Sequence, residues 1–350
     1  MSTLTGELRD QESEIVNNFL SSKSAIFAKL LKVQDEVWKC PKADEYFRNQ
    51  KARAVQSVSE EQKAGFFNMM TRIGDNFQDQ EKLIPPPWKR MNFDVLDLCM
   101  APGGFSATVL KYNRFAQVCA ISLPTNEGGL EIYLPGWQEK KRLKVQMLNL
   151  AMLSAELGFP DLASADQPST SKFSNHIPYA GQKFDLIFCD GHVLPSADPE
   201  QDLTSQRRLA DAQSVMALQR VKSAGTIVVL LHQVYNPRVL RLLEAFDRFS
   251  QITLFKPPFC HAKRTSFYLV AKNVDPQHEV ACRLIRDMRN SWRLRTGNAF
   301  GLEIPKDLKE PQDEEESLEG IMQSFGAKLI TLAEPLWKIQ TEAMEKAFLR

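Results

Sequence analysis

The stretch LDLCMAPGGFS at residues 96–106 decides how the rest of the chain is interpreted. A short apolar run ends at Cys99, and a proline, two glycines and a serine follow directly; the next residues favour a helix. This order predicts a buried strand, a tight turn and the first turn of a helix. Glycines let a ligand approach the backbone, and a helix N-terminus offers unpaired N–H groups with a positive partial charge. The stretch therefore predicts a site for a nucleotide-type ligand that carries a carboxylate or a phosphate.

The turn matches neither of the two common phosphate-binding motifs. It does not spell G-x-G-x-x-G, which argues against a dinucleotide, and no Gly-Lys-Ser/Thr follows it as in a P-loop. A tight turn that needs glycine for steric reasons alone is the alternative interpretation.

Short apolar runs alternate with helical segments on both sides of this stretch. The runs lie at 93–99, 116–122, 143–148, 184–190, 225–232, 251–255 and 266–273. Near-continuous apolar strands with helices between them predict a mostly parallel sheet that is covered on both faces. The last two runs are joined by the turn-rich segment 256–265, which predicts an antiparallel hairpin at one edge. The fold class is therefore α/β, with a seven-stranded sheet.

Helical spacing of apolar residues dominates both ends of the chain. We predict a helical N-terminal extension at 1–88, an α/β domain at 89–275, and a helical C-terminal extension with an acidic linker at 276–350. Three prolines at 85–87 end the first part, and we expect Trp88 to pack against the junction.

The composition is that of an ordinary globular protein, with 43% hydrophobic and 25% charged residues and a formal net charge of +1. Any contact with nucleic acid must therefore come from a local basic patch. The six cysteines are scattered without a C-x-x-C pair, which favours reduced thiols, and no metal site is predicted. There is no secretory h-region and no apolar run of about 18 residues, so we expect a cytoplasmic or nuclear protein that does not cross a membrane.

Three motifs together resemble one protein family. LDLCMAPGGFSATVL is similar to the first motif of the FtsJ-like methyltransferases, D-x-x-x-A-P-G-G-[FW]-[ST]; FDLIFCDGH at 184–192 resembles the fourth motif. GTIVVLLH and FKPPFCHAKRTSFYLVAKN resemble the last strands. The resemblance covers roughly residues 90–275 and is closest to a fungal branch of the family. It implies a Rossmann-like class I methyltransferase fold, S-adenosylmethionine as cofactor, and the ribose 2′-hydroxyl of RNA as methyl acceptor.

The resemblance also implies a set of cofactor-binding residues. Ser122 ends the second strand, where the family has an acidic partner for the ribose, and Asn149 follows the third, where the family offers an aspartate to the adenine. Asparagine can still accept a hydrogen bond from an exocyclic amine. Asp190 follows the fourth strand and reaches the cofactor cleft. The residues at the methionine end of the cofactor are Asp97, Ala101, Pro102, Gly103, Gly104, Phe105 and Ser106.

The catalytic positions of the family are mostly substituted. Asp190 matches the aspartate of the Lys-Asp-Lys-Glu tetrad, whereas His232 follows the fifth strand in place of a lysine and Ser266 replaces the glutamate. Lys63 is the candidate for the upstream lysine, at unsuitable spacing. We hypothesise that His232 is the general base, since histidine titrates near neutral pH; a structural histidine at the sheet end is the alternative.

The substituted tetrad leaves the acceptor open, because a ribose hydroxyl is a poor acid. One alternative is O-methylation of a small molecule with a more acidic hydroxyl, and another is a degenerate member that binds only the cofactor or a partner. Contact with RNA is predicted through basic residues near an aromatic, although a solvated basic helix face is an equal interpretation. These residues are Lys256, Lys263, Arg264, Arg283, Arg286, Arg289 and Arg293.

Overall fold

The computed structural model describes residues 2–55, 59–164, 171–193, 198–305, 308 and 317–350. The chain forms two compact units. The first comprises Met1–Arg53, Val229–Ala271 and Gln312–Arg350, and the second comprises Ala54–Val228 and Lys272–Pro311. Each unit is thus built from segments that are distant in the sequence. The domain boundaries expected from the sequence, 1–88, 89–275 and 276–350, stay a prediction.

Seven strands form one mixed sheet, in the order β3-β2-β1-β4-β5-β7-β6. Strands β1, β2, β3 and β4 pair in parallel. The α/β class and the mostly parallel sheet with antiparallel strands near one edge are confirmed. The strands are β1 (Asp94–Leu98), β2 (Gln117–Ser122), β3 (Leu143–Met147), β4 (Phe184–Cys189), β5 (Val221–His232), β6 (Gln251–Phe255) and β7 (Ser266–Val274).

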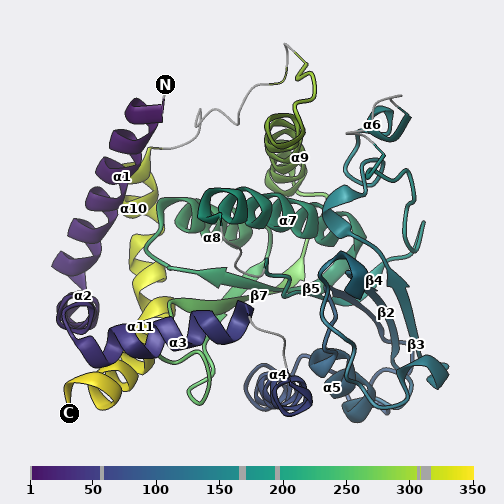
Figure 1. The fold of residues 1–350 in the computed structure, drawn as a ribbon, viewed down its shortest axis with the longest axis horizontal. Helices are drawn as coiled ribbons and strands as arrows, with labels where there is room; N and C mark the ends of the chain where they lie inside the picture. Colours follow the sequence, from purple (N-terminus) through teal and green to yellow (C-terminus); the bar gives the residue numbers. More distant parts are fainter. Residues whose placement is uncertain (1, 56–58, 165–170, 194–197, 306–307, 309–316) are drawn as a thin grey trace. The chain divides into compact units, whose positions relative to one another are not determined.

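In the second unit, helices cover both faces of the parallel strands (Figure 1). Helices α4 (Glu60–Glu81) and α5 (Gly104–Tyr112) pack together on one face, and α7 (Pro199–Arg220) and α9 (Glu279–Phe300) pack together on the other. Buried aromatic rings join α5 to the sheet: Phe105 stacks on Phe188 with ring centroids 4.9 Å apart. A short helix, α6 (Asp161–Ser164), also belongs to this unit.

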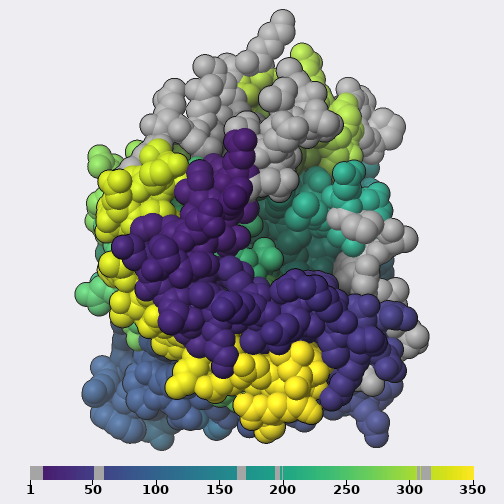
Figure 2. Space-filling view, turned by 90° about the vertical axis from the view of Figure 1, so that its left-hand side faces the viewer, coloured from purple at the N-terminus to yellow at the C-terminus, as the bar shows by residue number. Residues whose placement is uncertain are grey.

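In the first unit, the two ends of the chain form one helical layer. Figure 2 shows the N-terminal and C-terminal helices next to each other. Phe27 of α2 lies on Trp337 of α11, with ring centroids 4.7 Å apart. The helices of this unit are α1 (Ser2–Lys23), α2 (Ala25–Trp38), α3 (Pro41–Val55), α8 (Pro237–Phe249), α10 (Leu318–Ser324) and α11 (Gly326–Met344), followed by a π-helical turn at Glu345–Leu349.

The expected packing of Trp88 is wrong, because its side chain is exposed (83%). Leu83 and Ile84 fill the junction instead, and both are buried. The amide of Asn113 donates hydrogen bonds of 3.0 Å to the carbonyls of Pro85 and Arg90. The turn is therefore held through its backbone, and the indole is left pointing into solvent.

Candidate functional site

The glycine turn connects β1 to α5 as the sequence predicts. Gly103 is the N-cap residue of α5 with φ of 104°, a left-handed conformation that favours glycine. A Cβ atom on Gly104 would lie 2.6 Å from the backbone nitrogen of Thr71 in α4. The missing side chain of Gly104 thus allows close packing of α4 on α5, which is a steric reason for this second glycine.

Asp97 lies directly beneath this turn and is almost fully buried, with 2% exposure. The hydroxyl of Ser106, in the first turn of α5, donates a 2.6 Å hydrogen bond to its carboxylate. Burial raises the pKa of Asp97 from 3.8 to about 7, although the Ser106 hydrogen bond opposes the rise. Phe105, which precedes Ser106 in α5, is buried in the core. The turn therefore holds a carboxylate that a cationic ligand group would stabilise in its charged form.

A second carboxylate lies at the end of the neighbouring strand. Asp190 follows β4, whose last residue pairs with the last residue of β1 (Leu98 with Cys189). Cys99 lies in the field of both carboxylates: burial raises its pKa to about 12, and the charges of Asp97 and Asp190 add to the rise. The structure thus brings Asp97 and Asp190 to adjacent strand ends.

Gln213 of α7 holds the turn after Asp190, a role that sequence reasoning missed. Its Oε1 accepts a 2.8 Å hydrogen bond from the N–H of Gly191, and its Nε2 donates a 3.2 Å bond to the carbonyl of Gly191. Gln213 is buried (4% exposed). The signal in the sequence is a polar glutamine between apolar residues on the buried side of a helix, which needs an internal hydrogen-bond partner.

The second and third strands end in polar residues at the same edge. Ser122 is 1% exposed, and its hydroxyl has no hydrogen-bond partner among the residues that the structure describes. A buried polar group without a partner is costly, so a ligand that hydrogen-bonds this hydroxyl would stabilise the site. Asn149 is half-buried and begins the 3₁₀ turn Leu150–Met152 without a side-chain capping bond. Its carboxamide is therefore not used by the helix end.

These groups fit S-adenosylmethionine. The carboxylate of Asp97 suits an ammonium, the N-terminus of α5 suits a carboxylate, and Ser122 and Asn149 offer a hydroxyl and an amide for a sugar and a base.

The loop after β3 is held firmly, because the carbonyl of Ala151 accepts hydrogen bonds from Trp292 Nε1 (3.1 Å) and Arg208 Nη2 (3.5 Å).

Lys63 is poorly suited to act as a base. Its ammonium lies 2.7 Å from a carboxylate oxygen of both Glu60 and Glu131, and hydrogen bonds to them raise its pKa. A general base needs a lowered pKa instead. We therefore interpret Lys63 as part of a structural ion pair with Glu60 and Glu131.

The groups expected after the fifth strand lie in the first unit. His232 ends β5 and is exposed, whereas Ser266 begins β7 and is buried. Lys256 is also buried, and its ammonium donates hydrogen bonds of 2.6 and 2.7 Å to the carbonyls of Arg264 and Ser266. Burial lowers the pKa of Lys256 to about 7.

Several of the basic residues expected to contact RNA do not present their charge at the surface. Lys256 is 5% exposed and Arg293 6% exposed, and Arg293 donates to the carbonyl of Glu303. The ammonium of Lys263 lies 4.0 Å from the ring centre of Tyr46. Exposed positions are Arg264 and Arg286, while Arg283 and Arg289 are partly exposed.

The residues that the structure describes contain no helix long and apolar enough to span a membrane. They also contain no group of three or more histidines, cysteines or acidic residues placed to hold a metal ion.

Comparison with known proteins gives one family match. The model of the FtsJ-like methyltransferases matches residues 75–274. No curated protein sequence matches the chain.

Solved structures with a similar fold are distant. One, described as a ribosomal RNA methyltransferase from Plasmodium falciparum, is 13% identical with a TM-score of 0.39, covering 58% of this chain and 96% of that one. An rRNA methylase from Streptococcus thermophilus is 9% identical with a TM-score of 0.32, covering 63% and 99%. Human methyltransferase-like protein 13, in complex with SAH, is 11% identical with a TM-score of 0.35, covering 68% and 96%.

Proposed function

Because the chain belongs to the FtsJ-like methyltransferase family, we propose that it transfers a methyl group to a hydroxyl oxygen, with the ribose 2′-hydroxyl of RNA as acceptor. S-adenosylmethionine is the methyl donor. Support for the RNA acceptor comes from the family, and support for the donor comes also from the residues around the glycine turn.

The observation that carries the proposal is the position of this turn in the sheet. The strand order β3-β2-β1-β4 reverses direction at β1, and ligands of doubly wound sheets bind at the carboxyl ends of the strands at such a switch point. Asp97 and Asp190 lie at the ends of β1 and β4. Two carboxylates and a helix N-terminus therefore lie at adjacent strand ends on one edge of the sheet, a combination that favours a zwitterionic amino-acid group over a simple anion.

We assign the cofactor-binding roles to residues of this edge. When bound, S-adenosylmethionine supplies an electrophilic methyl group on a sulfonium. Asp97 receives the ammonium group, which keeps its carboxylate ionised despite burial. The first N–H groups of α5 receive the carboxylate. Ser122 and Asn149 hydrogen-bond the ribose and the adenine, which would satisfy the Ser122 hydroxyl.

We propose that Asp190 positions the acceptor, whereas the hypothesis that His232 removes the proton rests on the sequence alone, since His232 belongs to the first unit and Asp190 to the second. Methyl transfer is an in-line displacement in which a C–O bond forms, the C–S bond breaks, and the acceptor proton leaves to a base. Asp190 accepts a hydrogen bond from the acceptor hydroxyl at the end of β4. In that hypothesis the imidazole of His232 accepts the proton.

Two variants test these roles. Asp190→Ala should abolish transfer of a labelled methyl group to total RNA while leaving affinity for S-adenosylmethionine within about threefold, measured by isothermal titration. His232→Ala should lower turnover about 10²-fold, the typical contribution of a general base. Full activity of Asp190→Ala, or unchanged turnover of His232→Ala, would remove that residue from the mechanism.

A small-molecule acceptor is the second candidate. The pairing of Lys63 with two carboxylates favours it, since no low-pKa lysine is available there to activate a weakly acidic ribose hydroxyl. Labelling of a small-molecule extract, with none in RNA, would establish this candidate. Absence of cofactor binding at high micromolar concentration would instead leave a partner-binding scaffold.

A further inference from the structure

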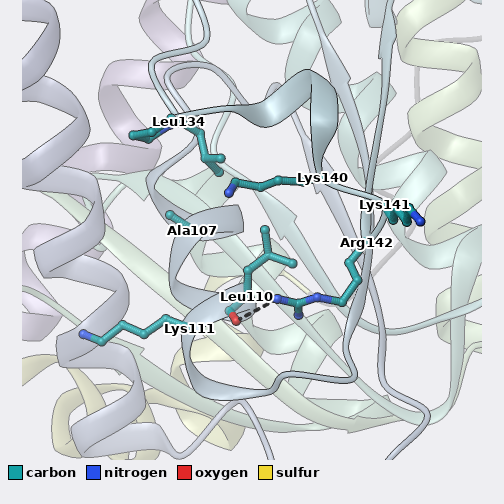
Figure 3. Close-up of a pocket in the computed structure, with 8 residues that line it drawn as sticks. Ala107, Leu110, Lys111, Leu134, Lys140, Lys141 and Arg142 are labelled. Carbon is teal, nitrogen blue, oxygen red and sulfur yellow. Dashed lines mark hydrogen bonds between the residues drawn. The ribbon is translucent and has the colours of Figure 1, made fainter.

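A cavity of about 500 Å³ lies on the outer side of α5, between that helix and the segment that returns to β3 (Figure 3). Apolar side chains form part of its wall, and Leu134 also lies against the turn, 3.2 Å from the position that a Cβ of Gly103 would take. The size is that of a nucleotide-binding pocket, since small-molecule sites range from about 300 to 1,000 Å³. The lining residues are Ala107, Leu110, Lys111, Leu134, Pro135, Lys140, Lys141 and Arg142.

The charge of this cavity is entirely positive. Four of its eight described lining residues are lysine or arginine, and none is acidic. The chain has a net charge of only +1, so four basic residues along one cavity are a local concentration and not a general property of the surface. Figure 3 shows the ammonium groups of Lys111 and Lys141 directed away from the other lining residues. Such a cavity favours an anionic ligand.

The charged groups of Lys111, Arg142 and Lys140 differ in the partners that they already have. Lys111 forms an ion pair with Asp75 at 2.8 Å. Arg142 donates to the carbonyls of Asn113 (3.1 Å) and Leu110 (3.4 Å), which fixes its guanidinium beside the last turn of α5 but leaves it without a carboxylate partner in the described chain. Lys140 is exposed, makes no ion pair with any described residue, and points its ammonium toward the centre of the cavity in Figure 3.

The geometry points to a phosphate-binding pocket for the RNA acceptor: we propose that one nucleotide of a bound RNA lies in this cavity. Lys140 and the fixed Arg142 contact its phosphodiester, and Leu110, Leu134 and Pro135 cover its apolar side. A free phosphate ion would fill only a small part of the space, whereas a nucleotide with its sugar uses both the cations and the apolar wall. This inference rests on the proposed RNA acceptor and assigns it a contact outside the edge where the methyl group is transferred.

The test measures the affinity of the full-length chain for a short fluorescein-labelled single-stranded RNA over a series of salt concentrations. We expect Lys140→Glu to weaken binding about tenfold and to reduce the slope of log K against log salt by about 0.7, the value for one lost phosphate contact on a single strand. Lys89→Glu is the matched control: it makes the same charge change at an exposed position outside the cavity. It should change the affinity by less than about twofold and leave the salt slope unchanged.

A variant of the apolar wall provides an independent measurement. Pro135→Asp adds a negative charge at an exposed lining position and should weaken RNA binding as Lys140→Glu does, without altering the affinity for S-adenosylmethionine. Equal RNA affinities of Lys140→Glu and the wild type would overturn the pocket while leaving methyl transfer to RNA intact. Failure of the wild type to bind RNA at all would overturn both the pocket and the RNA acceptor.

Discussion

At the scale of single residues, the main conflict in this protein lies at Asp97. A carboxylate with 2% exposure and one side-chain hydrogen bond is unfavourable in the folded chain, and burial therefore raises its pKa to about 7. The folded pKa is above the unfolded value, so the protonated carboxyl stabilises the fold at low pH. That stabilisation is lost as the pH rises through the folded pKa. The buried charge of Asp97 lowers stability at physiological pH. A ligand with a positively charged group beside the glycine turn would offset this cost, which explains why the residue is there.

We predict that Asp97→Asn separates these two effects. The amide cannot ionise, so the variant should unfold at a higher temperature than the wild type at pH 8, and the difference should shrink toward pH 4. Affinity for S-adenosylmethionine should fall at least about tenfold, the loss expected for one charged hydrogen bond. Thermal melts at both pH values and isothermal titration measure the two quantities. A variant less stable than the wild type at pH 8 would contradict the assigned cost of the buried charge.

At the scale of elements, α7 positions the end of β4. The side chain of Gln213 hydrogen-bonds both the N–H and the carbonyl of Gly191, and the turn that follows Asp190 thereby has a defined backbone. The β3 end is held in a similar way, by Trp292 of α9 on the carbonyl of Ala151. Helices on one face of the sheet thus fix the loops that would contact the cofactor and the acceptor.

We predict that Gln213→Leu destabilises the protein and impairs catalysis together. It leaves two buried backbone groups without partners, each costing about 1–3 kcal/mol. Turnover should drop more than the affinity for the methyl donor, because the turn carries Asp190. Gln206→Leu is the control on the same helix: its Oε1 accepts a 2.6 Å hydrogen bond from the N–H of Val193, where water can replace it. Comparable losses in urea unfolding for both variants would argue against a specific role of Gln213.

At the scale of the whole molecule, contacts between segments that are distant in the sequence hold the loops in place. Arg220, at the end of α7, forms a bidentate ion pair with Glu156 at 3.0 and 2.6 Å and donates a 2.9 Å bond to the carbonyl of Tyr179. Both charged side chains are buried. This group joins α7 to the segment after β3, through Glu156, and to the segment before β4, through Tyr179, all within the second unit.

We predict that Glu156→Gln costs about 3–5 kcal/mol in the free energy of unfolding, because it leaves the buried guanidinium without its counter-charge. The exposed pair of Lys39 and Asp35 serves for comparison, with side chains 73% and 66% exposed. Lys39→Ala should cost less than about 1 kcal/mol. Urea unfolding followed by circular dichroism gives both values, and equal costs would contradict the importance of burial for the Arg220 pair.

The sequence by itself determined the order and type of the elements and the class of ligand. Apolar runs at strand spacing, helical periodicity between them and the glycine turn are local patterns, so each predicts its own segment, and all seven strands lie where these patterns place them. Tertiary structure alone decided which polar groups are buried and what they contact. The second glycine of the turn serves a helix from the N-terminal part of the chain, Trp88 points outward, and Gln213 holds the turn after Asp190. The physical reason is that burial and hydrogen bonding join residues far apart in the chain, and no local pattern records the partner.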